Sequence, residues 1–308
     1  PTRGETMVTR YHPGERAVQE RAGLSEQAAF SDGAIRAEIP DVAAAFLAER
    51  TSLVVGAVDG GGDPWCTLLG GPPGFVRVLG PRTLEVDALP GAGDPLDGLL
   101  GRAPVRVGML AIEPQTRRRM RINGVAHPRS GGLRVTTDQV YANCPKYIQK
   151  RVPQPPPAGS RGTPTTGDRL SAEQQRLVEG ADTFFVATAD PGGATDASHR
   201  GGAPGFVRVH SPTRLEWPDY VGNAMFNTLG NLWARPQAGL LFPDWETGGV
   251  LHLTGAARIR WDGTDRSVEF EVERSVSVPG GGLLAPGAPL YSKFNPPVVP
   301  ASQSGASL

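Results

Sequence analysis

The side chains that could bind a charged, planar molecule gather in the second half of this chain. Arg200 offers a fork of hydrogen-bond donors that matches a phosphate group, and Ser198 and Asn223 can add neutral hydrogen bonds to it. Trp217 and Tyr220 offer flat apolar faces with polar tips. Together these residue types favour a site for an anion that is joined to an aromatic ring.

The spacing of these residues decides which of them can share a ligand. Successive side chains of a strand point to opposite faces, so Ser198 and Arg200 are expected on one face and His199 on the other. We therefore expect Ser198 and Arg200 to act together, without His199. Structural interpretations stay open for the same residues: an arginine on a strand is often ion-paired, Trp217 could belong to the core, and Asn227 could cap a short helix.

The elements that carry these residues occur twice in the chain. Residues 70–78 and 201–209 are identical at eight of nine positions, at an offset of 131 residues. The same offset, without a gap, pairs Gly108 with Gly239. A match of this length without a gap indicates an internal duplication, and we call the two halves the first copy and the second copy.

Each copy is predicted to begin with a short helix and to continue as short strands separated by glycine-rich turns. The helices are expected over residues 42–48 and 172–179, with Asp41 and Ser171 as N-caps. The clearest strands are expected over residues 53–58, 105–112 and 119–125 of the first copy and 184–189, 238–242 and 250–259 of the second. Short, evenly spaced strands, with 41 glycines and 30 prolines in 308 residues, favour a barrel or a sandwich.

The chain is predicted to contain five segments. They are an N-terminal helical extension (1–40, with an amphipathic helix over 14–29), the first copy (41–150), a linker rich in proline and glycine (151–168), the second copy (169–278) and an irregular tail (279–308).

The two copies differ where the polar side chains lie. Opposite His199 and Arg200 of the second copy, the first copy has the apolar residues Leu68 and Leu69. The first copy instead carries a basic segment rich in amides and tyrosine over residues 141–151, for which the second copy has no equivalent. A solvated basic stretch before the linker is the plainer interpretation of that segment.

Composition and motifs exclude several classes of function. A formal net charge of zero does not favour nucleic acid or acidic membranes as partners, and no apolar run is long enough to predict a membrane span. Cys66 and Cys144 lie far apart and predict reduced thiols in a cytoplasmic protein. The sequence lacks HExxH and CxxC metal motifs, a GxSxG elbow, a P-loop and a GxGxxG turn that opens a helix.

The second copy resembles the pyridoxamine 5′-phosphate oxidase-like superfamily, the FMN-binding split barrels. The resemblance rests on residues 198–202, 215–223, 236–242 and 251–257, and on residues 143–149 of the first copy. It implies a mainly β fold with short helices, in which two split β-barrel domains form an internal pseudo-dimer. The chain lacks the RxVLLK strand and the substrate-end arginine and histidine pattern of the vitamin B6 oxidase, so pyridoxamine phosphate is not the expected substrate.

The resemblance also implies one composite flavin site between two unequal copies. In that site Arg200 and Lys146 would hold the phosphate, and residues 217–220 would run along the flavin ring. The first copy would supply Lys146, Tyr147 and Gln149, and the second Ser198, Arg200, Trp217, Asp219, Tyr220, Asn223 and Asn227. If the reaction needs a proton donor or acceptor, the candidates are Tyr220, Asp219 and His199.

The leading hypothesis is an FMN-dependent oxidoreductase that acts on a small organic substrate, with a nicotinamide cofactor or a reductase as electron donor. The alternative is a non-catalytic flavin-binding or haem-binding protein that serves electron transfer. A deazaflavin or haem could replace FMN on the same barrel. The protein is expected to be a monomer, through its internal pseudo-dimer, or a homodimer, with no nucleic-acid or membrane partner.

Overall fold

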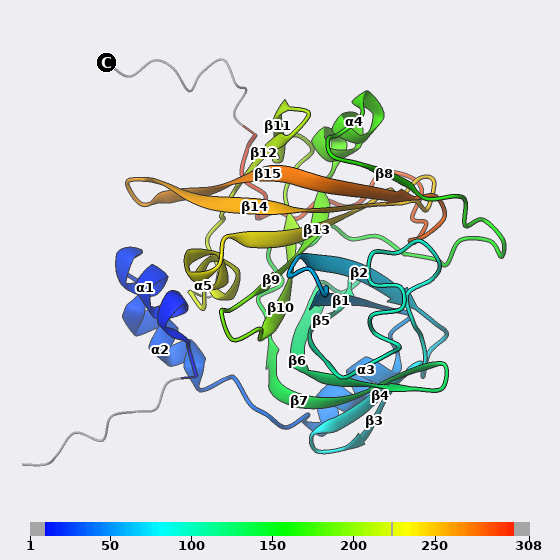
Figure 1. The fold of residues 1–308 in the computed structure, drawn as a ribbon. Helices are drawn as coiled ribbons and strands as arrows, with labels where there is room; N and C mark the ends of the chain where they lie inside the picture. Colours follow the sequence, from blue (N-terminus) through cyan, green and yellow to red (C-terminus); the bar gives the residue numbers. More distant parts are fainter. Residues whose placement is uncertain (1–9, 223, 299–308) are drawn as a thin grey trace, which may run out of the picture.

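The computed structural model describes residues 10–222 and 224–298, which form two antiparallel β-sheets with short helices around them (Figure 1). The helices are α1 (Pro13–Arg21), α2 (Ser25–Asp32), α3 (Asp41–Ala48), α4 (Ala172–Gly180) and α5 (Asn227–Ala234). The first sheet contains β1 (Ser52–Val58), β2 (Pro64–Gly70), β3 (Val76–Gly80), β4 (Thr83–Val86), β5 (Val105–Glu113), β6 (Arg118–Arg129) and β7 (Gly132–Ala142). The second contains β8 (Thr165–Gly167), β9 (Thr183–Ala189), β10 (Thr195–Gly201), β11 (Arg208–Ser211), β12 (Arg214–Pro218), β13 (Gln237–Pro243), β14 (Val250–Asp262) and β15 (Asp265–Val278).

The two sheets have the same strand order, which confirms the predicted fold. The first runs β2-β1-β5-β6-β7-β4-β3 and the second β10-β9-β13-β14-β15-β12-β11, with β8 added beside β15. The bounds of β1 and β9 differ by 131 residues, as do those of β2 and β10. The offset seen between the sequences is therefore also the offset between equivalent strands, as a duplicated β domain requires.

Most of the expected elements are confirmed, with small shifts at their ends. The single helix expected over residues 14–29 is wrong: Gly23, with φ of +68°, lies between two shorter helices, because the left-handed region that glycine adopts readily cannot continue an α-helix. Ser171 caps α4 as expected. Asp41, however, is the first residue of α3, and the N-cap is Pro40, which has no side-chain hydrogen bond to offer.

The two copies pack together through equivalent faces, where buried apolar side chains of both form one hydrophobic cluster. Close approach is possible because equivalent glycines occur in β5 and β13. A Cβ atom on Gly108 would lie 2.5 Å from the Cα atom of Asp196, and a Cβ atom on Gly239 would collide with the backbone of Pro64 and Trp65. Residue 65 plus the offset of 131 is residue 196, so the two contacts are equivalent and relate the copies as a pseudo-dimer.

We expect Gly108→Ala to destabilise the protein, because the new methyl group must displace the backbone of the other copy. Overpacking of this kind costs about 1–3 kcal/mol, which thermal or urea unfolding would measure. Gly60→Ala is the matched control, since a Cβ atom there would have no neighbour within 4 Å. Equal unfolding free energies for the two variants would contradict the tight junction.

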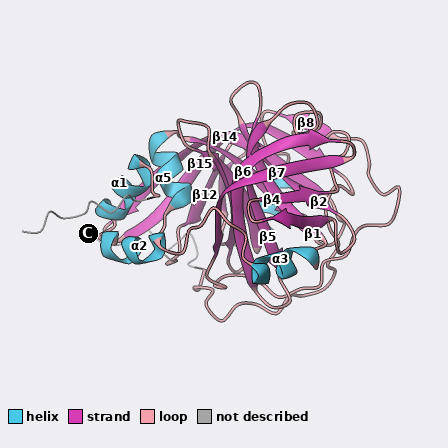
Figure 2. Ribbon diagram, turned by 90° about the horizontal axis from the view of Figure 1, so that it is seen from below, coloured by secondary structure: helices cyan, strands magenta, loops and turns pink. Residues whose placement is uncertain are grey.

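Segments outside the duplicated barrels also contact both copies. The segment predicted as a linker contributes β8 to the second sheet. The C-terminal segment returns to the junction, where Leu290 pairs with Lys150 and Leu284 with Gln154. The N-terminal helix α1 packs on α5, and Figure 2 shows α1, α2 and α5 gathered on one side of the strands. The division of the chain into five segments stays a prediction, but these contacts join the flanking segments to the copies.

In the described ranges, none of the helices has the length and apolar character needed to cross a membrane. The same residues contain no group of three or more histidine, cysteine, aspartate and glutamate side chains placed to hold a metal ion.

Candidate functional site

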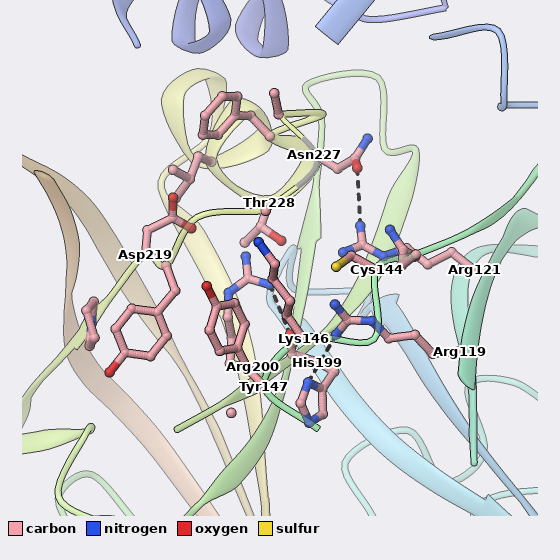
Figure 3. Close-up of a pocket in the computed structure, with 18 of the residues that line it drawn as sticks. Arg119, Arg121, Cys144, Lys146, Tyr147, His199, Arg200, Asp219, Asn227 and Thr228 are labelled. Carbon is pink, nitrogen blue, oxygen red and sulfur yellow. Dashed lines mark hydrogen bonds between the residues drawn. The ribbon is translucent and has the colours of Figure 1, made fainter. Parts of the chain in front are cut away.

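A pocket lies where the two copies meet, and side chains of both line it (Figure 3). The first copy contributes two arginines of β6 and the segment that follows β7: Arg119, Arg121, Asn143, Cys144, Lys146 and Tyr147. The second contributes the end of β10, the segment after β12 and the start of α5: His199, Arg200, Gly201, Phe206, Pro218, Asp219, Tyr220, Gly222, Ala224, Phe226, Asn227, Thr228 and Leu229. The site is composite, in the sense that neither copy alone encloses it.

Positive charge is concentrated in this pocket. Figure 3 shows the guanidinium groups of Arg119, Arg121 and Arg200 and the amine of Lys146 around one space. Within the described residues, neither Arg119 nor Arg200 forms an ion pair, and Nε of Arg119 has no hydrogen-bond partner. Burial, with the charges of Arg121 and Arg200, lowers the pKa of Arg119 to about 9. The pocket therefore holds protonated arginines whose charge the protein itself leaves uncompensated, as suits an anion-binding site.

Arg121 differs from Arg119 because a carboxylate of the other copy neutralises it. Its Nη1 atom lies 2.9 Å from Oδ2 of Asp196 and also donates to Oδ1 of Asn227 at 3.3 Å. Burial alone would lower the pKa of Arg121, but the charge of Asp196 raises it well above its usual range. The pair lies beneath the pocket and links β6 of the first copy to β10 of the second.

His199 lies inside the pocket as a neutral side chain. Burial and the neighbouring charge of Arg119 hold its pKa well below the usual value. Its Nδ1 atom lies 3.1 Å from Nη1 of Arg119, which can only donate, so Nδ1 is the acceptor and Nε2 carries the proton. The expectation that His199 points away from the ligand of Arg200 was wrong: both line the pocket. The pocket lies at the end of the edge strand β10, where side chains of both strand faces can reach it.

Two tyrosines, one from each copy, meet at the pocket. The rings of Tyr147 and Tyr220 lie 5.1 Å apart, centroid to centroid, and the Tyr147 hydroxyl donates to the carbonyl of Val221 at 2.9 Å. Asp219 also lines the pocket, but its carboxylate is held by Nε of Arg266 at 3.1 Å. Tyr147, Tyr220 and Asp219, together with Arg200, Lys146 and Asn227, were predicted site residues that the structure brings together.

Three other predicted site residues do not line the pocket, and each has a structural task. Ser198 is fully buried and bonds Asp196 and Thr228 through its hydroxyl. Trp217 is an inward-facing residue of β12, packed edge-on against Phe184 in the core of the second copy. The alternation of β12 directs it there, since Leu215 is buried on the same face.

Gln149 holds the C-terminal segment at the junction instead of facing the pocket. Its amide group donates to the carbonyls of Tyr147 and Gly202, and its oxygen accepts from the backbone of Ser292. The residue is 1% exposed, so a ligand in the pocket cannot reach it. Asn223, a further predicted ligand-binding residue, lies outside the described residues.

Arg119, Arg121 and Thr228 are pocket residues that the sequence analysis missed. The two arginines alternate along β6, so they share one face of the strand. At the offset of 131 residues the second copy has Val250 and His252 in their place. The comparison of copies that singled out Arg200 could have found these arginines as well, because their charge is confined to one copy.

The equivalent position on the other side of the junction cannot form a second such pocket. Leu68 and Leu69 replace His199 and Arg200 there. His252, which replaces Arg121, is fully buried and bonds the carbonyl of Cys66 at 2.8 Å. Burial lowers its pKa, so this side offers no permanent positive charge to an anion.

Comparison with known proteins relates the second copy to one family. Residues 170–274 match the family model described as pyridoxamine 5′-phosphate oxidase. Three solved structures are similar to this chain: a protein of the pyridoxinephosphate oxidase family from Clostridium acetobutylicum (16% identity, 36% of this chain, 89% of that chain, TM-score 0.29), an FMN-binding protein from Syntrophomonas wolfei (7%, 34%, 84%, 0.28) and the haem storage protein HutZ from Vibrio cholerae (15%, 37%, 97%, 0.29). A comparison with curated proteins gave no match. Over residues 170–274, this chain thus carries a domain of the pyridoxamine 5′-phosphate oxidase family.

Proposed function

We propose that the composite pocket binds one FMN per chain and that the protein is an FMN-dependent oxidoreductase acting on a small organic substrate. One observation carries the proposal: Arg119 and Arg200, from different copies, face one pocket without a carboxylate partner in the described residues. A phosphate group, which carries up to two negative charges at neutral pH, would compensate both. The family match of the second copy supports a flavin as the rest of the ligand.

The donor set fits the two ends of FMN. Arg119, Arg200 and Lys146 would hold the phosphate, with the Thr228 hydroxyl as a neutral donor. Tyr147 and Tyr220 would supply apolar faces for the flavin ring. The buried, unpaired Nε of Arg119 is the clearest sign of fit, because burying a charged group without a partner costs free energy that a bound anion returns.

FMN supplies the redox chemistry when bound, by accepting and releasing electrons or hydride, and the side chains position the reactants and handle protons. His199 can donate a hydrogen bond through Nε2 but cannot act as a base at neutral pH, because its pKa is lowered and Nδ1 is occupied. Burial and the proximity of Tyr147 raise the pKa of Tyr220, which keeps its hydroxyl protonated. We propose Tyr220 as the proton donor and His199 as a neutral hydrogen-bond donor.

The test is a titration of the purified chain with FMN and with riboflavin, which lacks the phosphate. We expect one FMN per chain, bound about 100-fold or more tightly than riboflavin, since each charge-assisted hydrogen bond contributes about 1.5–3 kcal/mol. A chain that shows no flavin absorbance after incubation with FMN and gel filtration would refute the proposal. FMN that binds but cannot be reduced by a nicotinamide cofactor or another donor would indicate the non-catalytic alternative.

A further inference from the structure

The N-terminal helix α1 lies outside both copies, yet it reaches the polar residues beneath the composite pocket. Close packing on α5 brings it there: a Cβ atom on Gly14 would collide with the carbonyl oxygen of Gly230. This approach places Glu15 at 5% exposure. The carboxylate accepts from the side-chain amide of Asn227 at 2.6 Å and from the backbone of His12 at 2.8 Å.

Glu15 is the outer end of a hydrogen-bonded chain that leads into the pocket. Asn227, held by Glu15, accepts from Nη1 of Arg121, and Arg121 pairs with Asp196. Asn227 and Arg121 both line the pocket. Glu15 is thus the second carboxylate, after Asp196, in contact with the network that orients Arg121.

We propose that Glu15 is a positioning residue that links anion binding in the composite pocket to the gain or loss of one proton on the N-terminal helix. The inference rests on the proposed function, because FMN is the anion concerned. An ionised Glu15 adds negative charge behind Arg121 and so weakens the attraction of the pocket for a phosphate. A protonated Glu15 removes that charge while its neighbours stay in place.

The surroundings of Glu15 allow it to change charge near neutral pH. Burial raises its pKa to about 7, against the opposing hydrogen bonds from His12 and Asn227. The groups that face it are Asn227 of α5, Asp196 of β10, Arg121 of β6, Tyr141 of β7, and Tyr11 and His12 beside α1. Of these, Arg121 keeps its charge, since its pKa is raised, and the tyrosines stay neutral, since theirs are raised as well.

The sign of the pH effect follows from linkage. A bound anion raises the pKa of Glu15 further, because like charges disfavour ionisation. FMN binding then takes up a proton, and by reciprocity the affinity for FMN falls as the pH rises through about 7.

The experiment measures the FMN dissociation constant of the full chain from about pH 6 to about pH 9, for the parent and for E15Q. The glutamine keeps the size and one hydrogen-bonding oxygen but has no charge to lose. We expect equal affinities near pH 6 and, near pH 9, an affinity of E15Q about 3- to 10-fold higher, on the scale of one partly screened charge interaction. Protonation of the FMN phosphate affects both proteins alike and cancels in the ratio.

E20Q is the matched control, because Glu20 lies on the same helix but is exposed, and its ratio to the parent should not change with pH. E15A tests the positioning role: it leaves the Asn227 amide without its acceptor, so FMN affinity should fall at every pH, and E15Q should restore it. A pH-independent ratio for E15Q, the same change in E20Q, or E15A binding as tightly as E15Q would overturn the inference. A parent chain that binds no FMN at any pH refutes the proposed function instead.

Discussion

Arg119→Met and Arg200→Ala should each weaken FMN binding about 10- to 150-fold, which corresponds to the loss of about 1.5–3 kcal/mol from a charge-assisted contact. The two arginines come from different copies but line the same pocket without ion pairs in the described chain. The double variant should lose most phosphate-dependent affinity. Because the residues share one ligand, the double effect need not equal the sum of the two. Fluorescence titration of FMN measures all three values.

Two controls separate a phosphate contact from general damage. Riboflavin affinity should change little in these variants, since the missing contacts are to the phosphate. Arg214→Ala removes an exposed arginine of β12 in the second copy, away from the pocket, and should bind FMN like the parent. Arginine variants with parental FMN affinity, or with equal losses for riboflavin and FMN, would contradict the assignment.

The same substitution should stabilise the protein without ligand. The pKa of Arg119 is lowered on folding, so its charged form destabilises the fold below about pH 9, and the cost fades as the pH rises above that value. A methionine removes this cost, and about 1 kcal/mol of extra unfolding free energy at neutral pH is a reasonable size. Such an exchange of stability for affinity is typical of a binding site and not of a structural ion pair.

Asp196→Ala should be the most destabilising single substitution of those considered, at about 3–5 kcal/mol, because it leaves the buried guanidinium of Arg121 without its counter-charge. The loss is compounded by Ser198 and Tyr141, whose hydroxyls also donate to this carboxylate. Urea unfolding monitored by circular dichroism would give the free energy.

The pair itself can be tested by removing both members. D196L with R121M should recover much of the stability, since an apolar pair of similar size avoids the cost of an uncompensated charge. Asp168→Ala removes an exposed carboxylate that pairs with Arg169 and should leave unfolding unchanged. A D196A variant as stable as D168A would show that Arg121 finds other compensation.

The duplication, the strand pattern and the composite character of the site could all be predicted from the sequence. Each depends on local or repeated information: alternation within strands, turns at glycine and proline, and a constant offset between copies. Divergence between copies was informative for the same reason, as the contrast of Arg200 with Leu69 shows. Lys146 and Tyr147 were assigned to the same pocket because a homodimeric site had to be completed by the other copy.

The errors concern residues whose role depends on what lies opposite them. Trp217 has the right chemistry for a flavin ring but faces the core, and Gln149 is an amide in the basic segment but holds the C-terminal chain. The helical extension was recognised, but not that Glu15 reaches Asn227, 212 residues away. Sequence pattern says which side chains share a face and does not say which partner covers it.

The sequence by itself determined the repeated β fold, the inequality of the two copies and the kinds of side chain that could hold an anion. Only the tertiary structure decided that Arg119, Arg121 and His199 share the pocket with Arg200, and that Asp196 neutralises just one of these cations. The physical reason is that charge compensation and burial depend on distances across the junction between the copies. Those distances are set by packing, including the contacts at Gly108 and Gly239, and not by the spacing of residues along either copy.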